Sequence, residues 1–93
     1  MPLQTEFRPS RKTRVLTQRA ADTVVLLDPD SGEYFSLDDV GGRIWELCDG
    51  TRTVAEIAAI LGTEYDADAA AIEDDVSELL AGLEEASLLA ARA

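Results

Sequence analysis

The apolar pattern of the chain changes once, close to residue 38, and this change limits the folds that the chain can adopt. Before residue 38, short β-prone runs are separated by turn residues. After it, apolar residues recur with helical spacing. The 93 residues are enough for one domain. The pattern predicts a single α+β domain in which three strands precede three helices.

Three short strands are expected in the first half, over residues 13–18, Thr23–Leu27 and 33–37. The middle run is almost continuously apolar, which is typical of a strand covered on both faces. The residues Pro29-Asp30-Ser31-Gly32 favour a turn, because proline presets φ and glycine tolerates a positive φ. The sequence therefore predicts a three-stranded antiparallel meander whose third strand lies at an edge.

Two short helices should follow. Asp38 or Asp39 is a candidate N-cap for the first, which should stop at Asp49-Gly50. Thr53 and Glu56 have the spacing of a capping box for the second, and Gly62 indicates its end.

The third helix should begin at Asp66 or Asp68 and run to about Ala86. Its apolar residues recur with helical spacing and predict a buried stripe: Ile72, Val76, Leu79, Leu80 and Leu83. The leucines that follow this helix, Leu88 and Leu89, should close the chain against the core.

The charge of the chain is large and unevenly spread. Nineteen acidic and eight basic residues give a net charge of −11. Residues 1–20 hold five of the basic residues and one acid, and we expect residues 1–12 to be a mobile basic segment ahead of a domain at 13–90. The rest of the chain, residues 21–93, is strongly acidic. This charge argues against a general nucleic-acid binder, because phosphate binding needs Lys and Arg. The same acidity suits a basic peptide or a basic patch on a protein partner.

The residue types give no support for an enzyme. The chain has no histidine and one cysteine, which argues against a zinc site, a histidine-based triad and a disulfide framework. We expect Cys48 to be a packed thiol, Trp45 to be a core residue and Gly41-Gly42 to allow a close approach of a neighbouring element. We expect no cofactor and no metal. Without an apolar run of about 20 residues or a secretory signal, no membrane association is expected and the default location is the cytoplasm.

Binding is the remaining function. An edge strand offers unpaired backbone groups to an added peptide strand. Tyr34 and Phe35 alternate along the expected edge strand, so one can enter the core while the other meets a ligand. A line on the third helix that includes Asp75, Glu78 and Leu79 could form a second, acidic wall. Ordinary packing residues and a solvated helix face are the alternative interpretations.

The stretch from residue 15 to residue 89 resembles the PqqD-like family of peptide chaperones, also called RiPP recognition elements. The resemblance rests on the order and spacing of a hairpin motif, a helix-pair motif and a third-helix motif. In this chain they are Leu26-Leu27-Asp28, Ser31-Gly32, Tyr34 and Leu37; Gly41 or Gly42 with Ile44-Trp45, Leu47, Asp49-Gly50, Thr53 and Glu56-Ile57; and Asp75-Val76, Leu79-Leu80 and Leu83.

The resemblance implies a winged-helix-like fold and a non-catalytic function. The leader segment of a ribosomally made precursor peptide would add as a fourth strand beside the third strand, against the third helix. The strand residues would be Tyr34, Phe35, Ser36 and Leu37. The helix wall would be Asp75 and Leu79, with Val76 behind them.

The resemblance also implies an enzyme partner that modifies the precursor. Leu47-Cys48-Asp49-Gly50 is similar to members that serve pyrroloquinoline quinone synthesis with a radical SAM enzyme. Residues 32–37 are similar to lasso-peptide members that work with a leader peptidase. Because the chain ends near Ala93, we expect it to act in trans on either pathway.

Two alternatives belong to other classes of function. A strand edge can pair with its own copy, which predicts a dimerising module without a peptide ligand, or a homodimer. A winged helix can also bind DNA, but the third helix would carry Glu73, Asp74, Asp75 and Glu78 towards the phosphates.

Overall fold

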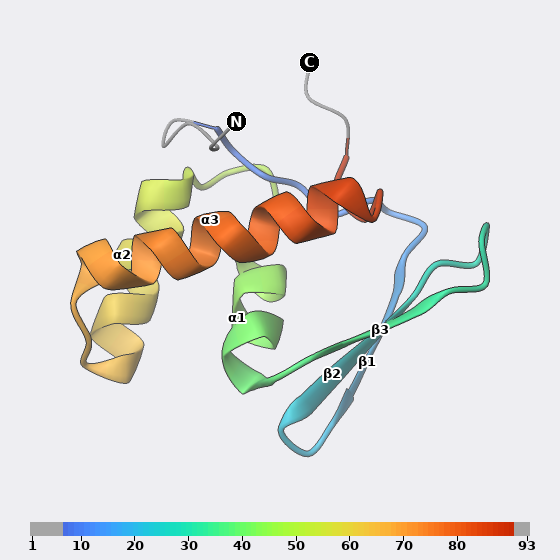
Figure 1. Ribbon diagram of the computed structural model, residues 1–93, viewed down its shortest axis with the longest axis horizontal. Helices are drawn as coiled ribbons and strands as arrows, with labels where there is room; N and C mark the ends of the chain where they lie inside the picture. Colours follow the sequence, from blue (N-terminus) through green and yellow to red (C-terminus); the bar gives the residue numbers. More distant parts are fainter. Residues whose placement is uncertain (1–6, 91–93) are drawn as a thin grey trace.

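A three-stranded antiparallel sheet is followed by three helices in the computed structural model, which describes residues 7–90 (Figure 1). The strands are β1 (Leu16–Ala20), β2 (Thr23–Leu27) and β3 (Tyr34–Leu37), in the order β1-β2-β3. The helices are α1 (Asp39–Leu47), α2 (Val54–Tyr65) and α3 (Ala69–Glu85). The α+β architecture and the meander predicted from the sequence are confirmed.

The first strand begins later than the local residue pattern predicts. β1 pairs Leu16 with Leu27 and Ala20 with Thr23, so only Ala21 and Asp22 connect the two strands. Ala21 closes this connection with a φ of 57°. The prediction of 13–18 was wrong at both ends, because the register with β2 and the tight turn decide where pairing starts.

The turn between β2 and β3 has the expected form. The Gly32 N–H donates to the Asp28 carbonyl at 2.7 Å, and Gly32 has a φ of 76°. Glycine adopts this conformation without the steric cost that a Cβ would add. The hairpin therefore brings Tyr34 opposite Leu27, at the start of β3.

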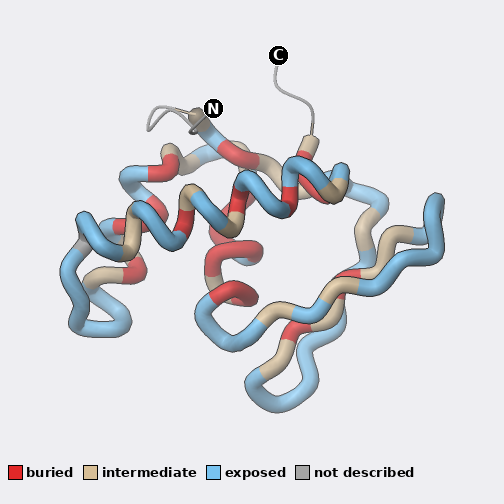
Figure 2. The backbone as a smooth tube through the Cα atoms, viewed as in Figure 1, coloured by how far each residue is buried: buried red, intermediate tan, exposed pale blue. Residues whose placement is uncertain are grey.

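Only one face of the sheet is fully covered. Val24 and Leu26 of β2 are buried, whereas Val25 and Leu27 on the other face are partly buried (Figure 2). The expectation that β2 is covered on both faces was wrong. On the covered face, a Cβ at Gly42 of α1 would collide with Val24, so this glycine permits the close helix–sheet approach that the sequence analysis expected.

Trp45 and Cys48 lie in the core, as predicted. Trp45 is 1% exposed, and its indole N–H donates to the Thr17 hydroxyl at 2.9 Å. The Cys48 thiol contacts the Ile44 carbonyl at 3.2 Å, and burial raises its pKa to about 12. Such a thiol is a packing group rather than a nucleophile.

The helix caps follow the sequence, with one exception. Asp38 caps α1, and Thr53 and Glu56 form the predicted capping box of α2. α2 does not stop at Gly62. It continues to Tyr65 and ends at Asp66, which has a left-handed φ of 50°.

Contacts with α1 explain the longer α2. Arg43 and Glu64 form an ion pair at 2.7 Å, and the hydrogen bond from Arg43 holds the pKa of Glu64 below its usual value. The Tyr65 hydroxyl donates to Asp39 at 3.2 Å. These tertiary contacts extend α2 past the glycine, which is a weak stop signal by itself.

α3 begins at the N-cap Asp68 and ends in a Schellman motif. The Leu88 N–H donates to the Leu83 carbonyl at 2.9 Å, and the Ser87 N–H donates to the Glu84 carbonyl at 3.0 Å. Ser87 takes the left-handed position, with a φ of 62°. This turn sends Leu88 and Leu89 into the core, as expected.

Residues 7–12, which we call the N-terminal segment, form backbone hydrogen bonds with the folded domain, whereas the sequence predicted a mobile lead-in. They lie between the α1–α2 loop and the residues after α3, with isolated β-bridges from Ser10 to Asp49 and from Arg11 to Leu89. Pro9 is buried. The backbone hydrogen bonds of an extended segment outweigh its polar composition here. The expected mobility of residues 1–6 falls outside the described residues.

Arg11 anchors the N-terminal segment to the end of α1. Its guanidinium donates to the carbonyls of Trp45 at 2.9 Å and Glu46 at 2.6 Å. The Trp45 carbonyl also accepts from the Cys48 N–H at 3.1 Å, so Arg11 adds a second donor there and places a positive charge at the helix C-terminus, where it is favourable. Arg11 therefore caps the C-terminus of α1.

Candidate functional site

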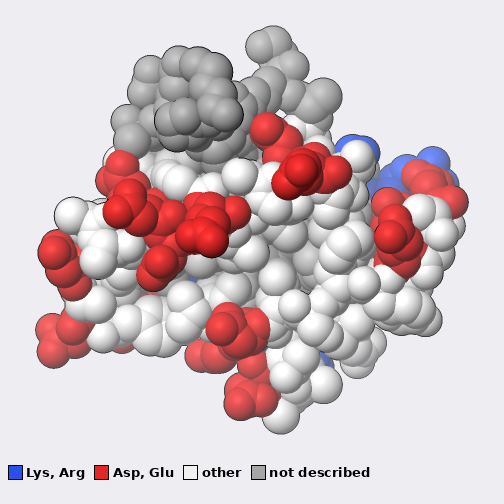
Figure 3. All heavy atoms as spheres, viewed as in Figure 1, with Lys and Arg blue, Asp and Glu red and all other residues white. Residues whose placement is uncertain are grey.

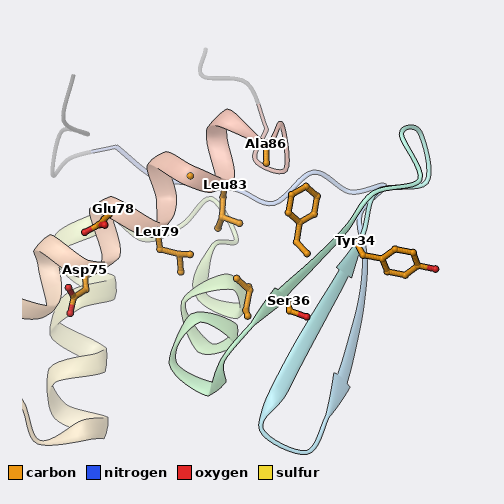
Figure 4. A pocket seen from close by; sticks show the side chains of 10 residues that line it. Tyr34, Ser36, Asp75, Glu78, Leu79, Leu83 and Ala86 are labelled. Atoms are coloured by element: carbon orange, nitrogen blue, oxygen red, sulfur yellow. The ribbon is translucent and has the colours of Figure 1, made fainter.

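β3 has an unpaired edge. In the described residues it pairs with β2 on one side, and no other strand lies on its second side. The unpaired edge faces a groove bounded by α3 (Figure 4). The site therefore combines a row of backbone donors and acceptors with a helical wall.

The groove has a volume of about 760 Å³. β3 contributes one wall along its whole length, Tyr34, Phe35, Ser36 and Leu37. α3 contributes the other wall: Asp75, Glu78, Leu79, Gly82, Leu83 and Ala86. A groove with a strand edge as one wall and a helix as the other suits an extended peptide chain.

A second hollow of about 530 Å³ continues the groove towards α1. It shares Ser36, Leu37, Asp75 and Leu79 with the groove and adds residues of the α1 N-terminus: Asp38, Val40, Gly41 and Ile44. The site is thus longer than β3 alone.

The strand residues predicted for the site divide between two faces. Phe35 and Leu37 are partly buried and pack against the core. Ser36 is exposed, and Tyr34 is 72% exposed, with its ring directed away from α3 in Figure 4. Because of this alternation, the inward side chains shape the groove floor and the backbone forms its edge.

The predicted helix residues also divide. Asp75 and Leu79 line the groove. Val76 is fully buried and belongs to the core rather than to the groove wall. Val76 therefore lies on the side of α3 that packs on the core, while Asp75 is exposed at the groove.

Glu78 lines the groove, as expected for the acidic wall. Three further groove residues of α3 were not among the predicted site residues: Gly82, Leu83 and Ala86. Counted from Asp75, they and Leu79 follow the spacing of one helix face. Extending that spacing along the third helix would have found them. Gly82 is the least obvious of them, and a Cβ at this position would meet nothing within 4 Å.

The groove carries negative charge on its helix wall. Within residues 7–90, Asp75 and Glu78 form no ion pair, whereas arginines elsewhere pair with acids, for example Arg14 with Asp30. Figure 3 shows acidic side chains along α3, above a largely uncharged surface. A cation bound in the groove would therefore meet unpaired carboxylates.

The described residues hold no group of His, Cys, Asp and Glu arranged to bind a metal ion. None of the described helices is long and apolar enough to cross a membrane. The site has the geometry of a binding groove.

Three comparisons place the chain among known proteins. The family model described as coenzyme PQQ synthesis protein D (PqqD) matches residues 23–89. A PqqA binding protein from Xanthomonas campestris pv. campestris (strain B100) is 45% identical over 76 residues, which cover 82% of this chain and 80% of that protein.

Two solved structures have the same fold. TbiB1, in complex with the TbiA(beta) leader peptide, matches with a TM-score of 0.79 and 34% identity, covering 90% of this chain and 98% of that chain. The solution NMR structure of the PqqD truncation of Methylobacterium extorquens PqqCD, a RiPP recognition element, matches with a TM-score of 0.76 and 39% identity. It covers 89% of this chain and 88% of that one. The family resemblance found in the sequence is confirmed: the chain belongs to the coenzyme PQQ synthesis protein D (PqqD) family.

Proposed function

We propose that this protein binds the leader segment of a ribosomally synthesised precursor peptide and presents it to a modifying enzyme. The observation that carries the proposal is the groove between the unpaired edge of β3 and α3. A peptide added at such an edge gains main-chain hydrogen bonds, and the neighbouring wall selects its side chains. Relatives described as a PqqA binding protein and as a complex with a leader peptide support the binding of such a peptide.

The residues have distinct parts in this proposal. The backbone of β3, from Tyr34 to Leu37, pairs with the leader. Asp75 and Leu79 line the opposite wall, together with the further groove residues of α3. Val76 acts from behind, because its burial fixes α3 on the core.

The proposed action is non-catalytic. The only thiol, Cys48, is buried, and the groove walls carry carboxylates, apolar groups and one hydroxyl, that of Ser36, apart from the outward Tyr34. The reaction belongs to the enzyme partner, for which the sequence motifs leave a radical SAM enzyme and a leader peptidase as alternatives. The domain at 13–90, extended by the N-terminal segment, would act as the adaptor.

The test is a titration of isotope-labelled protein with the leader of the precursor encoded beside the gene. Amide shifts should gather on Tyr34–Leu37 and on the groove face of α3. Gly82→Trp should abolish binding, because its side chain enters the open groove. Ala81→Trp is the matched control, since Ala81 is exposed and is not one of the groove-lining residues.

Two results would contradict the proposal. One is equal binding by the Gly82→Trp and Ala81→Trp variants. The other is a β3 edge occupied by a second copy of the chain, seen as a dimer in sedimentation that persists at saturating peptide. That second result would support the dimerising module instead.

A further inference from the structure

The groove differs from one end to the other. Near Leu37, its helix wall carries Asp75, and Glu78 follows three residues further along α3. Near Tyr34, the wall consists of Leu83 and Ala86. Figure 4 shows Asp75 and Glu78 towards one end of α3 and Leu83 and Ala86 towards the other. A ligand that lies along the groove therefore meets acid at one end and apolar surface at the other.

Charge complementarity favours a cation at the acidic end. No Lys or Arg is among the lining residues of the groove or of the hollow that continues it. Asp38, the third acid there, already accepts a hydrogen bond from the Gly41 N–H at 2.7 Å as the cap of α1. Asp75 and Glu78 remain available to an incoming Lys or Arg.

Helix and strand geometry sets the spacing between the two ends. Asp75 and Leu83 are eight residues apart on α3, which is about 12 Å along a helix axis. A strand rises about 3.3 Å per residue, so about four strand residues span this distance. Because four is even, both side chains point to the same face of the added strand.

The direction follows from β3. Its chain runs from Tyr34, at the apolar end, to Leu37, at the acidic end. Both strand pairs of the sheet are antiparallel, and antiparallel pairing is slightly the more stable kind. An antiparallel added strand runs from the acidic end to the apolar end.

From these observations we infer that the groove selects a leader with a Lys or Arg at one position and a large apolar residue about four positions later. The basic side chain pairs with Asp75 and Glu78, and the apolar side chain packs on Leu83 beside the gap left by Gly82. This inference rests on the proposed function and adds the residue pattern of the bound peptide.

A charge-reversal experiment tests the inference. The probe is the leader peptide of the precursor encoded beside the gene, with each Lys or Arg replaced in turn by Glu. We expect one replacement to weaken the affinity about fivefold, since an exposed ion pair contributes up to about 1 kcal/mol. Asp75→Lys or Glu78→Lys should restore the affinity of that variant peptide and of no other. Added salt should reduce the difference.

Asp74→Lys is the matched control, because Asp74 is exposed, adjacent to Asp75 and not a groove-lining residue. The inference is overturned if Asp74→Lys restores affinity as well as Asp75→Lys does, or if no replacement is rescued. It is also overturned if the Lys or Arg whose replacement is rescued follows the apolar residue in the leader sequence. A wild-type protein that binds no leader would contradict the proposed function itself, so the two failures are distinguishable.

Discussion

Two extended slots lie on this molecule, and only one is filled by the described chain. The first lies between the α1–α2 loop and the residues that follow α3, and the N-terminal segment occupies it. The Arg11 N–H donates to the Cys48 carbonyl at 2.9 Å, and the Lys12 N–H donates to the Leu88 carbonyl at 3.0 Å. The second slot is the groove between β3 and α3, which no residue from 7 to 90 fills.

The comparison separates residues that stabilise the fold from residues that bind. The filled slot is backed by fully buried side chains such as Leu88. Apart from Leu83, which is buried, the side chains that line the open groove are partly buried or exposed, such as Leu79 and Asp75. Changes at the first slot should therefore lower the free energy of unfolding, and changes at the second should lower peptide affinity.

The largest expected effect is at Leu88. Leu88→Ala removes a fully buried side chain and should lower the free energy of unfolding by about 2–5 kcal/mol. Leu79→Ala, in the partly buried groove wall, should lower it by about 1 kcal/mol or less and weaken leader binding. Urea denaturation and a peptide titration measure the two effects. Equal destabilisation by both variants would erase the distinction between the slots.

Arg11→Met should have the next largest effect. It removes the charged donor from the carbonyls of Trp45 and Glu46 and should cost about 1–2 kcal/mol of stability. Lys12→Met is a control with the same loss of charge, since the Lys12 side chain forms no ion pair within the described residues. If both variants unfold at the same urea concentration, the helix-capping role of Arg11 is wrong.

Ser87→Gly should stabilise the protein. Ser87 holds the left-handed position of the α3 Schellman motif, where a Cβ costs about 1 kcal/mol. Glycine removes this cost and leaves the groove unchanged. A higher urea midpoint with unaltered leader affinity is the expected result. A lower urea midpoint would contradict this prediction. It would show that glycine stabilises the unfolded chain, through its conformational entropy, by more than it relieves strain in the folded state.

The smallest effect is chemical rather than energetic. Burial raises the pKa of Cys48 to about 12, so the native thiol should resist alkylation at pH 8. Cys48 lies against the N-terminal segment, because its carbonyl accepts a hydrogen bond from the Arg11 N–H. Arg11→Met should speed alkylation by loosening that segment, whereas Leu79→Ala should not. Mass spectrometry of iodoacetamide-treated protein follows the rate, and fast labelling of the wild type would contradict the buried thiol.

Much of the fold could be predicted because its signals are local. The turn at residues 29–32 and the capping box at Thr53 and Glu56 depend on side chains a few residues apart. β1 was misplaced because its ends depend on pairing with β2. α2 was predicted too short because Arg43 and Tyr65, through contacts with distant acids, extend it beyond Gly62.

Less of the candidate site could be predicted. The edge strand and the pair Asp75 and Leu79 follow from order and periodicity, and all of them line the groove. Val76 was placed behind them, and its side chain is buried in the core and does not line the groove. Gly82 has no side chain to signal a role, and its importance comes only from the open space that faces it.

By itself, the sequence determined the elements, their order, the single-domain size and the acidic character of the third helix. Periodicity, caps and charge are properties of neighbouring residues, and they act before the chain is compact. Tertiary structure decided that residues 7–12 fill one slot and that, within residues 7–90, no strand covers the edge of β3 at the other. Both outcomes depend on hydrogen bonds and packing between residues far apart in the chain, such as Arg11 with Trp45, and no local pattern specifies such distances.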